Sequence, residues 1–330
     1  MVSVRKTAPF FEDQNLLAVI ESTKEASFQD LSAYLLEERE VIDELMLEYG
    51  AVLLRGFTVD DPKNFSQFTK EYFKKESLGS YLGGNSPRSA VLADVYTSTN
   101  TPPQDIIPQH LEMSYTNRMP ETIIFWCQTP SEQFGQTPLT NFQKIYECLD
   151  DSIKAVFADG VIFINHFISN RNFLRLLSKN TQALKSWEES YATCDVDKAI
   201  AICDKLGQKV KVLPGKLSVS EHISATVVHP KKKTIAWRLT PIYIGKNYID
   251  LKSYYMYSLV NSFYRLGFEI TFPDGSKIPK KYLNKIDQEI RAQTRSFLWQ
   301  KNDILIIDNY QVAHGRNYFI GDRKICVSFL

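Results

Sequence analysis

The cysteines of this 330-residue sequence are few, and their positions exclude the two structures that cysteines most often build. Cys127, Cys148, Cys194, Cys203 and Cys326 are odd in number and widely spaced, and no Cys-x-x-Cys pair occurs. Neither a disulfide framework nor a zinc knuckle is therefore indicated. Free thiols are typical of a reducing compartment, so we expect a cytoplasmic location.

Long apolar segments and an excess of one charge are also absent. No run of about 18 apolar residues occurs, and the first residues, Met-Val-Ser-Val-Arg-Lys, contain no apolar signal region. The formal net charge is only +1, from 39 Lys and Arg against 38 Asp and Glu. This balance predicts no membrane-spanning segment and gives no reason to expect binding to nucleic acid or to an anionic membrane.

A glycine-rich phosphate loop is missing as well. Gly83-Gly84-Asn85 is not followed by Lys and a hydroxyl residue, which a phosphate-binding loop requires. The residue patterns also lack a strict alternation of strands and helices. A doubly wound nucleotide-binding fold is therefore disfavoured.

Aromatic residues, in contrast, are abundant. Hydrophobic residues make up 44% of the chain and aromatic residues 12%, including 17 Tyr and 20 Phe. Such a composition suits a β-rich core or an enzyme with a pocket. The length is sufficient for one large domain or two small ones.

Hydrophobic periodicity predicts a mainly β fold with helical insertions. Helices are expected at 27–40, 41–49, 62–75, 140–157, 180–208, 250–266 and 279–294. Strands are expected at 50–56, 91–97, 121–128, 160–166, 225–229, 234–239, 303–308 and 324–330. Strands dominate both ends of residues 90–330 and helices lie between them, which is typical of a β-sandwich or jelly roll.

Two short stretches contain the residues best suited to metal chemistry: Pro108-Gln-His-Leu-Glu-Met-Ser-Tyr115 and Asp308-Asn-Tyr-Gln-Val-Ala-His-Gly-Arg316. His110 and Glu112 are two positions apart, so an extended chain places both side chains on one face. A distant histidine, His314, could complete a set of two histidines and one carboxylate. Such a set leaves positions open on iron(II) for a bidentate co-substrate and dioxygen.

Alternative explanations of the histidines stay open at this point, because His-x-Glu is common by chance. His166 and His222 have no carboxylate at metal-ligand spacing, and His229, which precedes Pro230, is expected to be structural. A zinc hydrolase is disfavoured because the chain has neither His-Glu-x-x-His nor a further ligand cluster.

Three blocks of the sequence resemble the TauD/TfdA (taurine dioxygenase-like) family. The first, between Val95 and Gln128, contains Tyr-Thr-Ser-Thr, Pro-Gln-His-Leu-Glu-Met-Ser-Tyr and Met-Pro-Glu-Thr-Ile-Ile-Phe-Trp-Cys. The second is Gly135-Gln-Thr-Pro-Leu139, and the third runs from His314 to Arg323. The resemblance extends in order from about residue 50 to the last residue. It is greatest to the branch with His-x-Glu, which includes clavaminate synthase-like enzymes and syringomycin-type aspartate hydroxylases.

This resemblance implies a double-stranded β-helix, the clavaminate synthase-like jelly roll, in a single oxygenase domain over residues 1–330. The expected parts are an N-terminal flank of helices and strands over about 1–85 and a core over about 86–330. Helical insertions are expected at about 175–220 and 250–295. The resemblance also implies Fe(II), with 2-oxoglutarate and dioxygen as co-substrates.

The same resemblance implies roles for individual residues. His110, Glu112 and His314 match the iron ligands of the family. Arg323 matches the arginine that pairs with the distal carboxylate of 2-oxoglutarate, and Thr137 matches the threonine that helps to hold it, as a guanidinium fork and a hydroxyl can. Related halogenases replace the carboxylate ligand with a small residue, so Glu112 implies hydroxylation, desaturation or epoxidation rather than halogenation.

Four further residues are candidate contacts of the substrate or co-substrate. Arg316 either contacts a bound molecule or locks the end of a strand through an ion pair. Arg118 and Arg238 either anchor a substrate carboxylate or phosphopantetheine or are solvated surface arginines. Tyr96, at the start of the Tyr-Thr-Ser-Thr stretch, is the fourth candidate.

The branch implies that the substrate is a small molecule, an amino acid or an amino-acid derivative, free or tethered to a carrier protein, in specialised metabolism such as antibiotic biosynthesis. The sequence departs from the family at Phe134, Asn141, Val327 and the stretch 237–240, around the expected substrate side. The substrate of a relative therefore does not transfer. A non-catalytic jelly roll that serves as a binding protein is the alternative, and the intact ligand set with Arg323 disfavours it.

Overall fold

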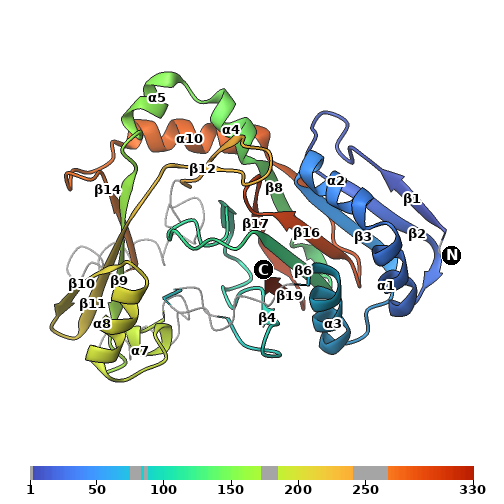
Figure 1. The fold of residues 1–330 in the computed structure, drawn as a ribbon, viewed down its shortest axis with the longest axis horizontal. Helices are drawn as coiled ribbons and strands as arrows, with labels where there is room; N and C mark the ends of the chain where they lie inside the picture. The colour runs from blue at the N-terminus through green and yellow to red at the C-terminus, as the bar shows by residue number, and fades with distance from the viewer. Residues whose placement is uncertain (1–2, 75–82, 85–87, 172–184, 241–266) are drawn as a thin grey trace.

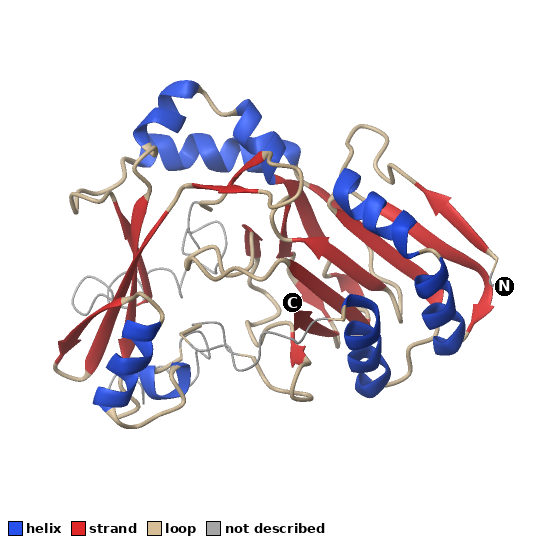
Figure 2. Cartoon of the chain, in the orientation of Figure 1, coloured by secondary structure: helices blue, strands red, loops and turns tan. Residues whose placement is uncertain are grey.

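The structure, a computed structural model, describes residues 3–74, 83–84, 88–171, 185–240 and 267–330. Two β-sheets face each other near its centre, and three helices cover the outer face of the larger one (Figure 1). A third sheet lies at the end of the molecule opposite the larger sheet (Figure 2). The remaining helices lie beside this third sheet or along the smaller sheet. No helix among the described residues is long and apolar enough to cross a membrane.

The larger sheet has seven strands in the order β1-β2-β3-β16-β6-β19-β4. They are β1 (Val4–Thr7), β2 (Ala18–Ala26), β3 (Ala51–Phe57), β16 (Ile304–Asp308), β6 (Thr122–Thr129), β19 (Lys324–Phe329) and β4 (Tyr96–Thr97). The central strands are continuous apolar runs, because both faces of this sheet are covered.

Helices α1 (Phe28–Glu37), α2 (Arg39–Tyr49) and α3 (Pro62–Phe73) pack on the outer face of the larger sheet. The side chain of Ser27 caps α1 together with Asp30, and Asp61 caps α3 immediately before Pro62. The ring of Phe65 stacks on Trp126 at 5.7 Å. The hydrophobic periodicity predicted these three helices correctly.

The smaller sheet has four strands in the order β15-β8-β17-β5, which are β15 (Arg295–Phe297), β8 (Thr137–Asn141), β17 (Val312–Arg316) and β5 (Ile107–His110). Its inner face packs on the larger sheet through Leu139 and Val312, which meet Phe125 and Leu305 in one buried cluster. Its outer face is covered by α4 (Phe142–Cys148) and α10 (Lys280–Gln293). Two facing sheets closed by a common core are the arrangement expected of a jelly roll.

The third sheet has four strands in the order β10-β11-β9-β14: β10 (Lys209–Leu213), β11 (Lys216–Ile223), β9 (Val161–Ile168) and β14 (Gly267–Thr271). The other described elements are helices α5 (Asp151–Val156), α7 (Trp187–Ser190) and α8 (Val196–Lys205), the hairpin of β12 (Thr226–Val228) and β13 (Ile235–Trp237), and the pair β7 (Gln133–Phe134) and β18 (Phe319–Ile320).

This third sheet corrects two expected insertions. The expectation of helix over about 175–220 is wrong for β10 and for most of β11. Lys209 and Lys211 alternate with apolar residues in β10 and face outward, and β11 pairs with β9 over its whole length. In the described part of the insertion expected at about 250–295, which begins at residue 267, residues 267–271 form β14 and only α10 is helical. The helix expected at 250–266 lies outside the described residues.

Smaller corrections concern element boundaries. β1 and β2 were not predicted, and strand pairing in the segment expected at 91–97 is confined to β4. The helix expected at 140–157 begins only after Asn141, whose side chain caps α4. It is interrupted at Leu149, where the backbone is extended (ψ 138°). Periodicity alone gave no signal for these breaks.

Candidate metal centre and co-substrate site

The smaller sheet brings the two candidate histidine ligands together. β5 and β17 are antiparallel neighbours, and His110 pairs directly with His314. Their rings are 4.7 Å apart between centroids. Two residues that are distant in the sequence thus become neighbours because their strands share a sheet.

Glu112 lies just beyond the end of β5, in a turn where Met113 has a φ of 56°. The expected extended His-x-Glu strand therefore ends at His110. The side chains still alternate, because Leu111 points to the opposite side, where it is fully buried in the cluster that contains Phe142 of α4. Glu112 consequently points to the same side as His110, as the period of two predicted.

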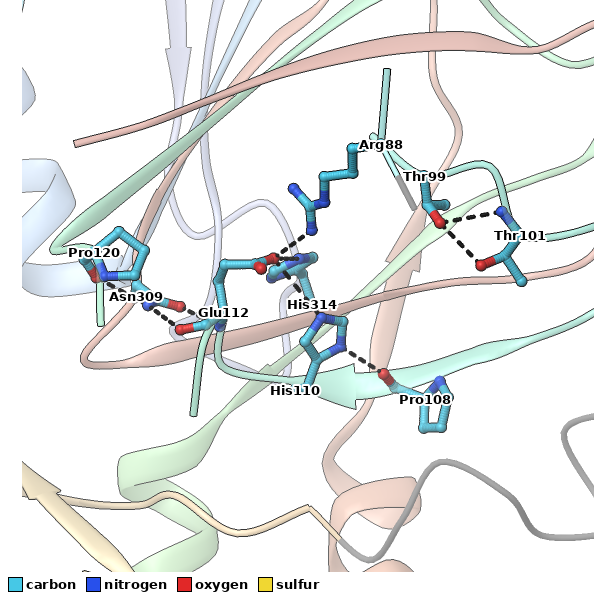
Figure 3. A network of polar contacts seen from close by, with 9 residues as sticks. All are labelled: Arg88, Thr99, Thr101, Pro108, His110, Glu112, Pro120, Asn309 and His314. Atoms are coloured by element: carbon cyan, nitrogen blue, oxygen red, sulfur yellow. Dashed lines mark hydrogen bonds and ion pairs between the residues drawn. The ribbon is translucent and has the colours of Figure 1, made fainter. Parts of the chain in front are cut away.

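The three side chains point toward one another (Figure 3). Oε2 of Glu112 is 3.9 Å from Nε2 of His110 and 3.8 Å from Nε2 of His314. One ligand atom from each of the three residues lies within 4.8 Å of the others. Ligand bonds of about 2.0–2.2 Å at right angles would place donor atoms about 3 Å apart, so small movements of these side chains would let all three bind a single divalent ion. Two imidazoles and one carboxylate therefore fit a mononuclear iron(II) centre.

Both histidines are held in the form that binds a metal. Nδ1 of His110 is 2.9 Å from the carbonyl oxygen of Pro108, so it carries the proton and leaves Nε2 as the free donor atom. Burial lowers the pKa of His110, partly opposed by the charge of Glu112. Burial also lowers the pKa of His314 well below its usual value, and the positive charges of His110 and Arg88 act in the same direction.

Two residues that the sequence did not identify surround Glu112. Asn309, which is fully buried, accepts a hydrogen bond from the backbone N–H of Glu112 at 2.7 Å and donates to its carbonyl at 3.0 Å. Nη2 of Arg88 donates to Oε2 of Glu112 at 2.9 Å. The only signal for Asn309 is its position between a predicted strand and His314. No sequence pattern around Arg88 indicates a role in the site.

Arg323 and Thr137 lie near the start of β8, which is the neighbour of β17. Nε of Arg323 donates to the carbonyl oxygen of Gly135 at 3.3 Å. In the described part of the chain, Arg323 forms no ion pair with a carboxylate. Burial lowers its pKa to about 10, and the charge of Arg316 adds to this effect. A half-buried cation with no carboxylate partner among the described residues is suited to binding an anion.

The hydroxyl of Thr137 is oriented by a neighbouring indole. Nε1 of Trp299 donates to Oγ1 of Thr137 at 2.9 Å, and both residues are buried. Within the described ranges, no group accepts the hydroxyl proton of Thr137. That proton can therefore be donated to a carboxylate bound beside Arg323.

The contacts of Arg316 favour its structural interpretation, with one correction. Its guanidinium donates to the carbonyl oxygens of Thr101 at 2.8 Å, Pro102 at 2.6 Å and Asp105 at 2.8 Å. Carbonyl groups, rather than the expected ion pair, thus tie the end of β17 to the loop at 101–105.

Arg238 also holds backbone. Its Nε donates to the carbonyl of Ser114 at 2.9 Å, and Nη2 donates to the carbonyl of Thr116, so it braces the turn after Glu112. It is 5% exposed, which rules out the solvated surface position. These contacts favour a role in shaping the turn.

Arg118 and Tyr96 differ in how far their side-chain polar atoms are engaged in hydrogen bonds. Nη2 of Arg118 is 3.5 Å from Oγ1 of Thr116, and its buried Nε has no hydrogen-bond partner among the described residues. Arg118 therefore keeps donor capacity for a bound anion. The hydroxyl of Tyr96 donates to the carbonyl of Ala93 at 3.2 Å, and its ring packs on Phe329.

The remaining histidines have other partners, as expected. Nε2 of His229 is 2.7 Å from Oδ2 of Asp308, and its Nδ1 accepts from the backbone N–H groups of Lys231 and Lys232. His229 thus joins the turn of the β12–β13 hairpin to the end of β16. Its expected structural role agrees with these contacts.

Two facing sheets with a mostly buried His-Glu-His cluster at the strand ends define a jelly-roll protein with a mononuclear metal centre. Comparison with known proteins gives the family. Residues 12–328 match the model of the taurine catabolism dioxygenase TauD, TfdA family. The chain therefore belongs to this family, and the expected class, a 2-oxoglutarate-dependent non-haem iron oxygenase, is confirmed.

Two curated proteins are similar to this chain over most of their lengths. The dapdiamide synthesis protein DdaC of Enterobacter agglomerans is 26% identical over 316 residues, which cover 94% of this chain and 90% of that protein. A clavaminate synthase-like protein of Arabidopsis thaliana is 24% identical over 301 residues, which cover 88% and 84%.

Among solved structures, PvcB from Pseudomonas aeruginosa superposes with a TM-score of 0.56 at 14% identity, covering 99% of this chain and 91% of that one. At this identity the similarity speaks for the fold alone. Together with the sheet arrangement, it confirms the expected mainly β jelly roll with helical insertions.

Proposed function

We propose that His110, Glu112 and His314 hold Fe(II), and that Arg323 and Thr137 hold the distal carboxylate of 2-oxoglutarate. The observation that carries this proposal is the convergence of three ligand atoms within 4.8 Å at a buried position. Iron(II) bound there would supply the activation of dioxygen by oxidative decarboxylation of 2-oxoglutarate. We further propose that residues 1–330 form one oxygenase domain in a reducing cytoplasm.

The protein residues supply binding, orientation and exclusion of water. The hydrogen bond from His110 to Pro108 holds one ligand ring in place, and Asn309 holds the backbone of Glu112. Arg323 offers a planar pair of donors that matches a carboxylate. Thr137 adds a hydroxyl proton to the same group. This division separates the metal ligands from the co-substrate anchor.

The reaction that we propose is hydroxylation of an unactivated C–H bond in an amino acid or amino-acid derivative, free or bound to a carrier protein, in specialised metabolism. One relative supports this, because the similar protein DdaC is a dapdiamide synthesis protein. Glu112 occupies the carboxylate position of the ligand set. Desaturation or epoxidation at the same centre is the alternative outcome.

Anaerobic titration with Fe(II) and 2-oxoglutarate tests the site. We expect a weak charge-transfer band in the visible region, because 2-oxoglutarate chelates the metal. The band should be lost in His314→Ala and retained in the matched control His222→Ala. Nε2 of His222 is 2.7 Å from the carbonyl of Asp159, outside the cluster. A missing band in the unmodified protein, or an unchanged band in His314→Ala, would show that these residues do not hold iron.

The substrate class is tested by release of succinate. The unmodified protein, Fe(II) and 2-oxoglutarate are incubated aerobically with amino acids and with carrier-bound aminoacyl groups, and products are examined by mass spectrometry. A gain of one oxygen atom indicates hydroxylation or epoxidation, and a loss of two hydrogens indicates desaturation. Binding of both ligands without turnover of any compound would favour the non-catalytic alternative.

A further inference from the structure

The aromatic ring of Phe319 in β18 is shared by two arginine side chains. Cζ of Arg323 lies over this ring at 5.6 Å from its centroid, and Cζ of Arg316 lies over it at 5.2 Å. A guanidinium within about 6 Å of an aromatic face is attracted by the negative charge of the π electrons. Phe319 thus contacts both the proposed co-substrate anchor and the arginine that ties the end of β17 to the loop at 101–105.

The two arginines use their hydrogen-bond donors in different ways. Arg316 donates to three backbone carbonyls through both of its terminal nitrogens. Arg323 has one hydrogen bond within the described ranges, from Nε to the carbonyl of Gly135, and at 3.3 Å it is longer than the usual 2.9–3.0 Å. A single long bond through Nε does not fix the plane of a guanidinium. The ring of Phe319 is placed to do so.

The two arginines also repel each other. Burial lowers the pKa of Arg323, and the positive charge of Arg316 lowers it further. Among the described residues, no carboxylate forms an ion pair with Arg323 that would offset this repulsion. The face of the Phe319 ring offers both cations a region of negative charge. Removal of the ring should therefore let the guanidinium of Arg323 turn away from Arg316.

Backbone contacts fix the position of Phe319 itself. Its N–H donates to the carbonyl of Pro103 at 3.0 Å, and its strand pairs with β7. Gly135 has a φ of 69°, and a Cβ at this glycine would lie 3.1 Å from Cβ of Phe319. The carbonyl of the same glycine accepts the hydrogen bond from Arg323. Phe319, Gly135 and Arg323 are thus packed together, two residues before Thr137.

We propose that Phe319 is a positioning residue, whose ring holds the guanidinium of Arg323 in the orientation that pairs with the distal carboxylate of 2-oxoglutarate. This inference rests on the proposed function, because it requires Arg323 to be the co-substrate anchor. A ring holds the guanidinium by its face and leaves the terminal N–H groups free for the two carboxylate oxygens. A hydrogen-bond acceptor in the same place would compete with the carboxylate for these donors.

The experiment compares the binding of two α-keto acids in anaerobic titrations of the protein loaded with Fe(II). The first is 2-oxoglutarate. The second is 2-oxopentanoate, which keeps the chelating keto and carboxylate groups and the chain length but lacks the distal carboxylate. The charge-transfer band reports the binding of either acid. In Phe319→Leu we expect 2-oxoglutarate to bind roughly 2–30-fold more weakly, as the loss of a cation–π contact predicts, and 2-oxopentanoate to bind with unchanged affinity.

Further variants separate positioning from packing. Phe319→Tyr should retain the affinity for 2-oxoglutarate, because its ring offers the same face to the two cations. Tyr318→Leu is the matched control and should bind both acids normally, because its exposed ring packs on Phe134 in the same strand pair, with centroids 4.6 Å apart. Circular dichroism checks that each variant is folded, and Phe319→Met replaces Phe319→Leu if the latter is not.

A double variant tests whether the ring acts through Arg323. Arg323→Met alone should weaken the binding of 2-oxoglutarate, and addition of Phe319→Leu should weaken it no further, because the side chain that the ring positions is already absent. Additive losses would overturn the inference, since Phe319 would then act independently of Arg323.

The other outcomes separate this inference from the proposed function. Equal weakening of both acids in folded Phe319→Leu, or unchanged affinity for 2-oxoglutarate, would overturn the inference, while the band in the unmodified protein leaves the metal centre standing. Unchanged affinity for 2-oxoglutarate in Arg323→Met would refute the proposed anchor and the inference with it. Absence of the band in the unmodified protein would refute the proposed metal centre as well.

Discussion

Asn309 provides the sharpest test of how the fold positions the metal ligands. Its side chain accepts from the N–H of Glu112 at 2.7 Å and donates to the carbonyls of Glu112 at 3.0 Å and Pro120 at 2.9 Å. Asn309→Ala removes all three hydrogen bonds and leaves their backbone partners unsatisfied in a buried place. Each such loss is worth about 1–2 kcal/mol, so we expect the free energy of unfolding to fall by about 3–6 kcal/mol.

The substitution should also weaken metal binding, because the backbone of Glu112 is no longer held in the turn. Loss of a partner of this kind lowers metal affinity roughly 10–100-fold. Thermal unfolding of the metal-free protein measures the first effect, for which we expect a melting temperature lower by roughly 5–10 °C in a chain of this size. Anaerobic titration with Fe(II) at low temperature, where the variant is folded, measures the second.

Asn317→Ala is the matched control. Its side-chain amide donates to Oε1 of Gln136 at 3.2 Å in a half-buried position, so we expect a loss of at most about 1 kcal/mol and unchanged affinity for Fe(II). If Asn309→Ala melts at a lower temperature but binds Fe(II) with unchanged affinity, Asn309 stabilises the fold without positioning Glu112. An unchanged melting temperature would contradict the energetic reasoning itself.

Three further predictions concern the co-substrate, pH and strand spacing. Arg323→Met should raise KM for 2-oxoglutarate roughly 10–100-fold without altering Fe(II) affinity, measured by succinate release and by titration. Burial lowers the pKa of His110 and His314, so the unfolded chain binds more protons than the folded chain below about pH 6.5, and stability falls as pH falls. The metal-free protein should therefore lose stability between pH 7.5 and 5.5 in guanidinium unfolding, and a variant with both histidines changed to Ala should lose less. Gly315→Ala places a Cβ 2.5 Å from the carbonyl of Ile107, which should push β5 from β17, separate the two histidines and weaken Fe(II) binding in titration.

The residues of the candidate site could be predicted from the sequence to different degrees. His110, Glu112 and His314 stand out because histidine and carboxylate are metal ligands, and only five histidines occur. Thr137 and Arg323 required the family resemblance, since a lone threonine or arginine carries no specific signal. Arg88 was missed altogether, because what distinguishes it is a contact with a residue that lies 24 positions away.

The errors in secondary structure have a common physical origin. β10 and most of β11 were expected to be helical because they lie in the insertion expected at about 175–220, but β9 offers an edge with which β11 pairs from residue 216 to residue 223. The choice between strand and helix was thus made by a distant neighbour. Arg238 shows the same limit for a side chain, because its buried position follows from the turn that it braces.

The sequence by itself determined the ligand chemistry, the three helices between residues 27 and 75 and the mainly β character, because these depend on residue type and on patterns within a few positions. Only the tertiary structure decided that His110 and His314 are adjacent, since pairing of β5 with β17 brings together residues about two hundred positions apart. It also decided which arginines bind backbone carbonyls through both terminal nitrogens, as Arg316 does, and which keep these donors for an anion, as Arg323 does. Burial and pairing are properties of the packed chain, and no local pattern specifies them.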